Sequence, residues 1–131
     1  MLKASQILIL VIVSLAYWAL ATLYIRYVPT ALLGPIQAVI SFALAAPVGW
    51  ASILLARRLA RLGQAQLLPG IGVVGASAMM LDALVLRWAP QVYGTDGAAV
   101  LRGAAWLLWG YGVSFAIAVV MATRPGDQAV S

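Results

Sequence analysis

Four long stretches of the chain are almost free of charge, and short charged segments separate them. Three of these apolar runs contain no charged residue at all: Ile7–Ile25, Ile36–Ala56 and Gly103–Ala122. The fourth, Ile71–Leu86, contains one, Asp82. A bilayer core about 30 Å thick needs about 20 apolar residues for each crossing helix. The pattern therefore predicts four membrane-spanning helices.

We expect the spans at approximately residues 7–25, 36–56, 70–88 and 102–122, within a single transmembrane domain that covers residues 1–131. The predicted fold class is all-α, an integral membrane four-helix bundle. Lys3 and the apolar run after it resemble a secretory signal, but the run is longer than a signal core of about 7–15 residues. We therefore expect an uncleaved first helix.

Proline, glycine and aspartate mark the expected helix ends. Pro35 suits the first turn of the second helix, and Asp96 suits the N-cap of the fourth. Gly63 is placed to cap the end of the second helix. Pro47 lies inside the second span, where it removes a backbone hydrogen bond, and it predicts a kink there.

The composition supports a membrane protein and argues against an enzyme. The chain is 65% hydrophobic and only 8% charged, whereas soluble domains are about 25% charged. It contains no His, Cys or Glu, so thiolate metal sites, imidazole ligation and paired catalytic carboxylates are not expected. We predict no catalytic, cofactor-binding or metal-binding residue and no cofactor.

The positive charges predict an orientation. One end of the bundle, with both termini and the middle loop, carries five basic residues: Lys3, Arg57, Arg58, Arg61 and Arg124. The other end carries three: Arg26, Arg87 and Arg102. Lys and Arg are enriched in cytoplasmic loops, so we expect cytoplasmic termini, although so small a difference leaves dual insertion open. No basic residue lies in a soluble module, so the net charge of +5 does not predict nucleic-acid binding.

Two similar segments suggest an internal repeat. Arg26-Tyr27-Val28-Pro29 and Arg87-Trp88-Ala89-Pro90 lie 61 positions apart. The same offset superimposes the first helix on the third and the second on the fourth. Two tandem helical hairpins related by pseudo-twofold symmetry would produce this pattern, as parallel repeats do in transporters. Coincidence in an apolar sequence of low complexity is the alternative.

Small residues recur at every fourth position on two of the predicted helices. Candidate packing positions are Ser41, Ala45 and Gly49 on the second helix and Gly110, Ser114 and Ala118 on the fourth. Helices in lipid associate through close backbone approach at small residues. The stripes predict packing either within the chain or across a dimer face.

Asp82 is the one charged residue inside the four apolar runs, and ionisable residues within membrane spans are functional candidates by default. Arg26 and Arg102 should reach the same leaflet, and Arg87 closes the same helix as Asp82. We expect an ion pair of Asp82 with Arg26 or Arg102, which would offset the cost of burying the carboxylate. A proton or cation relay and a ligand contact are the alternatives.

The residues also carry a resemblance. Met79-Met80-Leu81-Asp82-Ala83-Leu84, with the later segments Arg87-Trp88-Ala89-Pro90 and Trp106-Leu107-Leu108-Trp109-Gly110-Tyr111-Gly112, resembles a family of small bacterial four-helix membrane proteins of unknown function. The resemblance implies a bacterial inner-membrane location. It implies no activity, substrate or cofactor.

The sequence therefore favours a non-enzymatic accessory, assembly or packing subunit of the inner membrane. Its expected partners are the lipid bilayer and either further copies of itself or a larger membrane complex. The alternative is a small dimeric transporter or channel that uses Asp82 as its polar site. Small multidrug exporters have a comparable length but depend on a membrane-embedded Glu, which this chain lacks.

Overall fold

The fold consists of four long helices joined by short connections. The computed structural model describes residues 1–124. The long helices are α1 (Ala4–Tyr27), α3 (Pro35–Ala60), α4 (Leu67–Trp88) and α5 (Gly97–Ala122). The connections contain the short helix α2 (Thr30–Leu33) and two 3₁₀ turns, η1 (Gln64–Gln66) and η2 (Pro90–Val92). The predicted all-α four-helix arrangement is confirmed.

Each of the four long helices is long and apolar enough to cross a membrane. At their C-terminal ends, α1 and α3 extend beyond the predicted spans, because arginines lie within their last turns rather than after them. Arg26 is in the last turn of α1, and Arg57 and Arg58 are in the last turn of α3. A cation at a helix C-terminus interacts favourably with the helix dipole, and its long stem lets the charged head reach the interface.

The signals at the helix starts are confirmed, whereas the predicted glycine cap is wrong. Pro35 occupies the first turn of α3, and the Asp96 side chain accepts a hydrogen bond from the Ala98 N–H at 3.1 Å. The left-handed residue that ends α3 is Arg61, with φ 53°, while Gly63 precedes η1 instead.

A residue of α1 explains why α3 can end without a glycine. The Gln6 side-chain nitrogen donates to the carbonyl oxygens of Ala60 and Arg61 at 3.1 and 3.2 Å. These carbonyls have no partner inside the helix, so Gln6 satisfies them from a neighbouring helix. No local pattern predicts this contact, because Gln6 and Ala60 are 54 residues apart.

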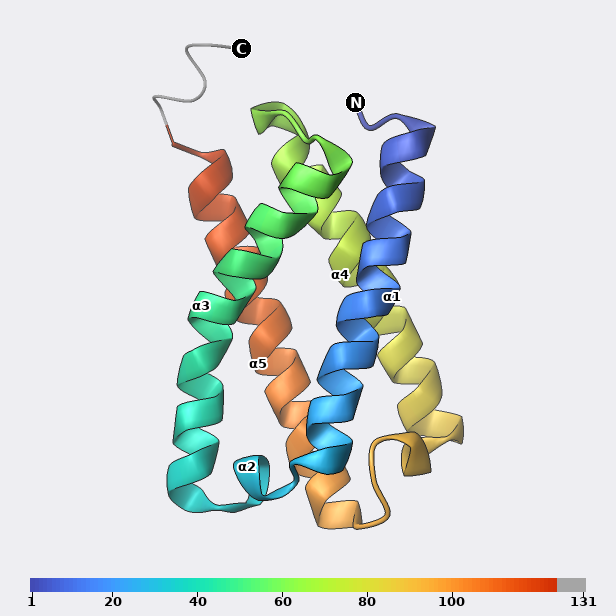
Figure 1. The fold of residues 1–131 in the computed structure, drawn as a ribbon, viewed down its shortest axis with the longest axis vertical. Coiled ribbons are helices and arrows are strands. Elements are labelled where there is room, and N and C mark those ends of the chain that lie inside the picture. Colours follow the sequence, from blue (N-terminus) through green and yellow to red (C-terminus); the bar gives the residue numbers. More distant parts are fainter. Residues whose placement is uncertain (125–131) are drawn as a thin grey trace.

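The four long helices run between two ends of the molecule (Figure 1). The start of α1, the end of α5 and the α3–α4 connection lie at one end, and α2 and η2 lie at the other. The most extensive packing joins α3 to α5 and α1 to α4. The proposed repeat superimposes α1 on α4 and α3 on α5, so the helices that it relates are also the ones that pack most extensively. The duplication itself stays a prediction.

Most of the candidate packing residues contact other helices of the same chain. Ser41, Ala45 and Gly49 are buried on α3. A Cβ added at Gly49 would lie 2.8 Å from the Ser114 Oγ on α5, and Ala118 is fully buried. Gly49 and Ser114 therefore serve the α3–α5 contact, and the buried members of this set are covered within the chain.

Gly110 differs from the other members of this set. A Cβ built at Gly110 meets no atom within 4 Å, so this glycine does not support close packing within the chain. Gly110 was predicted as a packing residue only because it lies four positions before Ser114. In the structure, α5 is rotated so that this position faces no close neighbour within the chain.

Pro47 lies in the middle of a bent helix. It is the thirteenth of the 26 residues of α3, and Figure 1 shows α3 changing direction about halfway along its length. Proline removes the N–H that would bond to the Ala43 carbonyl. Beside this turn, the Trp109 indole N–H of α5 donates to the Phe42 carbonyl at 2.8 Å. The bend thus lies where α5 reaches the backbone of α3.

Candidate functional site

The candidate site is centred on the buried carboxylate of Asp82 on α4. Asp82 is only 4% exposed. One carboxylate oxygen accepts a hydrogen bond from the Tyr93 hydroxyl, and the other accepts one from the Tyr111 hydroxyl. Two O–H donors thus take the place of the water that a carboxylate would have at the surface, which lowers the cost of burying it.

Tyr93 reaches the carboxylate from the connection between α4 and α5. Pro90 begins the turn η2, and Tyr93 caps its end, 1% exposed and pointing into the bundle. Burial, and then its hydrogen bond to Asp82, raise the pKa of the Tyr93 phenol. The phenol therefore stays protonated and remains a donor.

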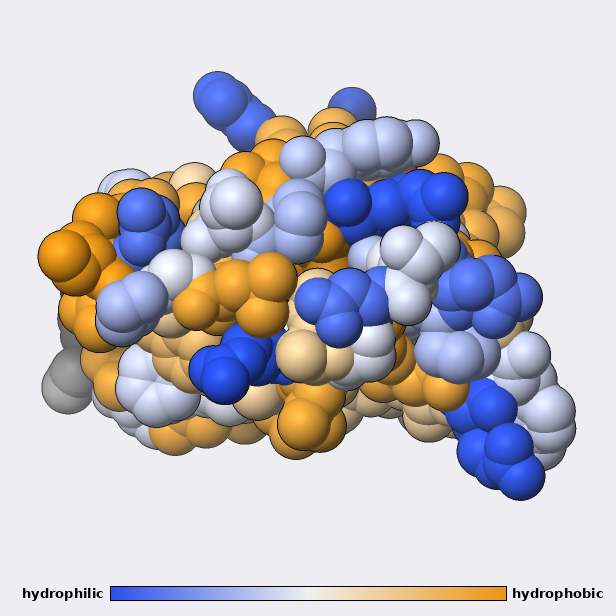
Figure 2. Space-filling view, turned by 90° about the horizontal axis from the view of Figure 1, so that it is seen from below, coloured by the Kyte–Doolittle hydropathy of each residue, from blue (hydrophilic) through white to orange (hydrophobic). Residues whose placement is uncertain are grey.

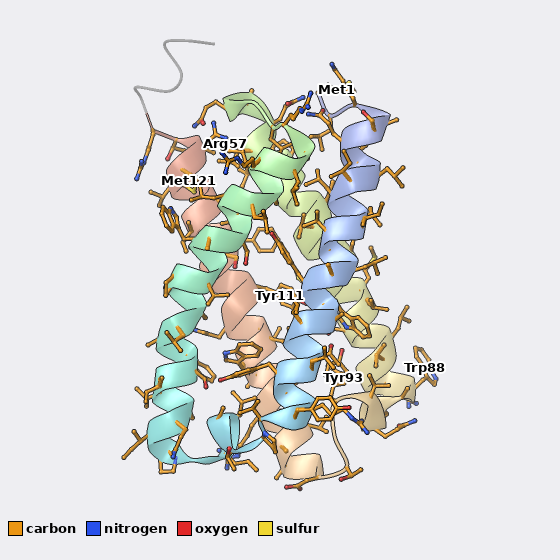
Figure 3. All side chains as sticks on the ribbon, in the orientation of Figure 1. Met1, Arg57, Trp88, Tyr93, Tyr111 and Met121 are labelled. Atoms are coloured by element: carbon orange, nitrogen blue, oxygen red, sulfur yellow. The ribbon has the colours of Figure 1, made fainter. Side chains whose placement is uncertain are left out.

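Two further helices complete the cluster. Tyr111 comes from α5, and the Trp18 indole of α1 donates to the Tyr93 hydroxyl at 3.1 Å. Figure 3 shows Tyr111 near mid-height of the bundle and Tyr93 closer to the end that holds η2. Asp82 and its partners thus join α1, α4, α5 and the α4–α5 connection.

Arg26 contacts this connection rather than Asp82. Its guanidinium donates to the carbonyl oxygens of Gln91 and Val92 at 2.6 and 3.2 Å. The two carbonyls belong to η2, directly before Tyr93 in the chain. Arg26 thus fastens the turn that carries Tyr93, and its relation to Asp82 is indirect.

The other two candidate arginines lie at the surface. Arg87 and Arg102 are exposed, and the Arg87 guanidinium lies 5.5 Å from the centroid of the Trp88 ring, within the range of a cation–π contact. Figure 2 looks onto this end of the molecule and shows hydrophilic residues scattered among hydrophobic ones.

The structure therefore gives Asp82 different partners from the arginines we expected. The physical reason is that a tyrosine hydroxyl can satisfy a buried carboxylate without burying a second charge, whereas an ion pair requires the desolvation of two charges. The sequence pattern did not single out Tyr93, Tyr111 or Trp18 as partners of Asp82. A usable signal was present for two of them, since Trp18 and Tyr111 have polar tips that need a partner when they lie inside a span.

Thr22 is a further polar residue that the sequence analysis overlooked. It follows Trp18 by four positions and so shares its face of α1. Its Oγ1 is buried and makes no hydrogen bond of normal geometry within residues 1–124, although the Thr22 side chain lies close to the Tyr93 hydroxyl. Buried polar atoms without a partner are uncommon in proteins.

A second hydrogen-bonded cluster near the same end is centred on Ser41. Its hydroxyl donates to the Ala31 carbonyl of α2 and shares a hydrogen bond with the Tyr24 hydroxyl of α1, both at 2.8 Å. The Trp106 indole of α5 donates to the Ser41 carbonyl at 3.1 Å. Ser41, predicted as a packing residue, thus also links three other helices by hydrogen bonds.

The sequence predicts no metal centre in this chain, and the structure addresses this point for residues 1–124 only. Within residues 1–124, no group of three or more His, Cys, Asp or Glu side chains could hold a metal ion. Asp82 is the acid of its cluster, and its neighbours are phenol, indole and hydroxyl groups. The arrangement can accept and share hydrogen bonds between helices.

The fold and the candidate site together define a multi-pass membrane protein with one buried, tyrosine-bound carboxylate. Comparisons with protein-family models, curated proteins and solved structures find no match. The four apolar helices are compatible with the small bacterial membrane family that the sequence resembles. Membership of that family stays a prediction.

Proposed function

We propose that this chain is a non-catalytic subunit of the bacterial inner membrane that acts by packing against other membrane helices. The observation that carries the proposal is the hydrogen bonding of Asp82. Both of its oxygens accept hydrogen bonds from tyrosines of the same chain, which makes the residue an interhelical clamp.

Other polar side chains of the interior support this interpretation. The Ser14 hydroxyl of α1 donates to the Val74 carbonyl of α4 at 2.8 Å, and the Tyr17 hydroxyl donates to the Ser52 carbonyl of α3 at 2.7 Å. A relay needs polar groups that can exchange partners along a path. In this chain the interior polar groups hold the helices to one another. The surface available to partners is the apolar outer face of the bundle.

The proposed orientation has both termini in the cytoplasm. The end that holds the start of α1 and the end of α5 carries five basic residues, and the opposite end carries three. Positive residues in short loops favour the cytoplasmic side. Fusion of a reporter active only in the cytoplasm to either end should therefore give signal at both, and a signal at neither would contradict this orientation.

Single-cysteine cross-linking in native membranes tests the proposed role. The chain contains no Cys, so each introduced thiol is the only one. Four exposed apolar positions, one on each long helix, suit this test: Leu8, Val39, Met80 and Leu108. We expect at least one of the four cysteine variants to give a discrete product of higher mass at native expression levels.

The fully buried Ala118 supplies the matched control, because Ala118→Cys places the thiol where no partner can reach it. A product from Ala118→Cys equal to the others would indicate non-specific capture. If all four exposed positions yield only the monomer, the proposal of a packing subunit fails.

A small dimeric transporter or channel is the second candidate, and the hydroxyl groups next to Asp82 are the observation that favours it. The Thr22 side chain of α1 lies close to the Tyr93 hydroxyl, which in turn donates to Asp82. Hydroxyl groups beside a buried acid are the groups that a proton or cation path would use. We expect such a protein to mediate flux in proteoliposomes that Asp82→Asn abolishes, while Asp96→Asn at the exposed helix cap does not. Absent flux, or flux unchanged by Asp82→Asn, rules this mechanism out.

A further inference from the structure

A hollow at the arginine-rich end of α3 combines positive charge with apolar walls. It has a volume of about 610 Å³ and is lined by residues of the last turns of α3 and by Leu62: Leu54, Leu55, Arg57, Arg58 and Leu62. Leu54 and Leu55 precede the two arginines by one turn, so the apolar walls lie deeper in the bilayer than the charges. This order of apolar and basic groups matches that of a phospholipid, whose acyl chains lie below its phosphate.

Hydrogen bonds to neighbouring segments hold one of the lining residues of the hollow, Arg57, in place. The Arg57 guanidinium donates to the Gln64 side-chain oxygen at 3.3 Å, and the Gln64 amide donates to the Met121 carbonyl at the end of α5 at 2.7 Å. Figure 3 shows Arg57 close to Met121 at this end of the bundle. Gln64 therefore links the Arg57 guanidinium of α3 to the end of α5. Arg58, in contrast, is exposed.

A second hollow lies between α3 and α5 toward the same end. Its volume is about 250 Å³, and Trp50 of α3 faces four residues of α5 and Arg124 across it: Ala116, Ile117, Val120, Met121 and Arg124. It resembles the first hollow in having apolar walls and an arginine toward this end of the bundle. The end of α3 thus has two apolar recesses nearby, the second of them between α3 and α5, and each has at least one arginine in its lining.

The charge of this end is not balanced within the structure. Of the carboxylates in residues 1–124, Asp82 bonds to tyrosines toward the opposite end, and Asp96 caps the start of α5 at that end. The basic residues around the hollows therefore have no acidic side chain near them in the described part of the chain. Basic pockets between membrane helices are binding sites for anionic phospholipid head groups.

We propose that the hollow at the end of α3 binds an anionic phospholipid, with its phosphate on Arg57 and Arg58 and an acyl chain against Leu54 and Leu55. The guanidinium groups donate hydrogen bonds to the phosphate oxygens, for which their planar geometry is suited. This proposal does not depend on the proposed packing role. It requires only that the four helices span a bilayer.

Retention of lipid by the purified full-length chain tests the proposal. The protein is reconstituted in nanodiscs of phosphatidylcholine with a minor fraction of phosphatidylglycerol, released into detergent, and assayed for bound lipid by native mass spectrometry. We expect phosphatidylglycerol to be enriched on the protein over its share in the bilayer. The variant Arg57→Gln/Arg58→Gln should lower that enrichment about 30-fold, given about 1 kcal/mol for each basic residue near an anionic surface.

The matched control removes two charges from the same end but outside the hollow. Lys3→Gln/Arg61→Gln should retain phosphatidylglycerol as the unaltered chain does, because neither side chain lines the hollow. Equal losses in the two double variants would show a general surface attraction and overturn the proposed site. Equal retention of phosphatidylglycerol and phosphatidylcholine by the unaltered chain would also overturn it.

Folding of the variants is checked separately. The Arg57→Gln/Arg58→Gln variant should elute as a single species with a thermal transition in lipid-free detergent within a few degrees of that of the unaltered chain. If it does not, Arg58→Gln alone is the deciding variant, since Arg58 is exposed and leaves the Arg57–Gln64 contact intact. Unchanged enrichment in Arg58→Gln would then contradict the proposal.

Discussion

Replacing Asp82 with leucine is expected to lower the free energy of unfolding by roughly 2–5 kcal/mol, since each buried donor left without an acceptor costs about 1–3 kcal/mol. Leucine has a similar size but no oxygen, so the hydroxyls of Tyr93 and Tyr111 both lose their acceptor. Tyr93 is 1% exposed, so it cannot turn to water without leaving its place. Asp82→Asn retains one acceptor oxygen and should cost less than Asp82→Leu.

A double-mutant cycle separates the hydrogen bond from general disruption. Tyr93→Phe removes only the hydroxyl, and Tyr27→Phe, at a tyrosine that is 71% exposed, is the matched control. If the clamp is real, Asp82→Leu and Tyr93→Phe should couple by more than about 1 kcal/mol, above the average of about 0.6 kcal/mol for hydrogen bonds in membrane proteins. The measurement is unfolding in mixed micelles with increasing denaturing detergent. Additive effects of the two substitutions would contradict the clamp.

The second large effect is expected at Gly75 of α4. A Cβ at this position would lie 2.3 Å from the Phe115 Cζ of α5, and two further ring atoms would lie within 3.2 Å of it. The whole ring edge would have to move, so Gly75→Ala should destabilise the fold by about 1–3 kcal/mol. A larger residue such as valine should cost more. The same unfolding assay measures both variants.

Gly72 supplies the control on the same helix. A Cβ built there meets no atom within 4 Å, and glycine inside a helix is about 1 kcal/mol less favourable than alanine. Gly72→Ala should therefore leave stability unchanged or raise it by up to about 1 kcal/mol. Equal effects of Gly75→Ala and Gly72→Ala would mean that the α4–α5 contact does not depend on a glycine at position 75.

The two glycines also show the limits of sequence analysis. Both lie in the same glycine-rich start of the third predicted span, and spacing alone could not say which one faces a neighbour. Likewise, spacing placed Gly49 and Gly110 in equivalent stripes, yet Gly49 meets Ser114 and Gly110 meets nothing. The rotation of each helix about its axis decides such contacts. It depends on all of the helix's neighbours together, and a run of apolar residues with little contrast between its faces encodes it weakly.

The sequence by itself determined the number of long helices, their approximate bounds and the capping role of Asp96, because these follow from local hydropathy and backbone chemistry. Only the tertiary structure decided that Asp82 bonds to Tyr93 and Tyr111, while Arg26 fastens the turn before Tyr93. In the sequence, the opposite charges of Asp82 and the arginines favoured the prediction of an ion pair. Nothing in the sequence indicates which buried group the hydroxyl of a distant tyrosine will contact. The deciding factor is desolvation: a neutral hydroxyl that the fold has already buried satisfies the carboxylate, and the arginines keep their charges at the membrane surface.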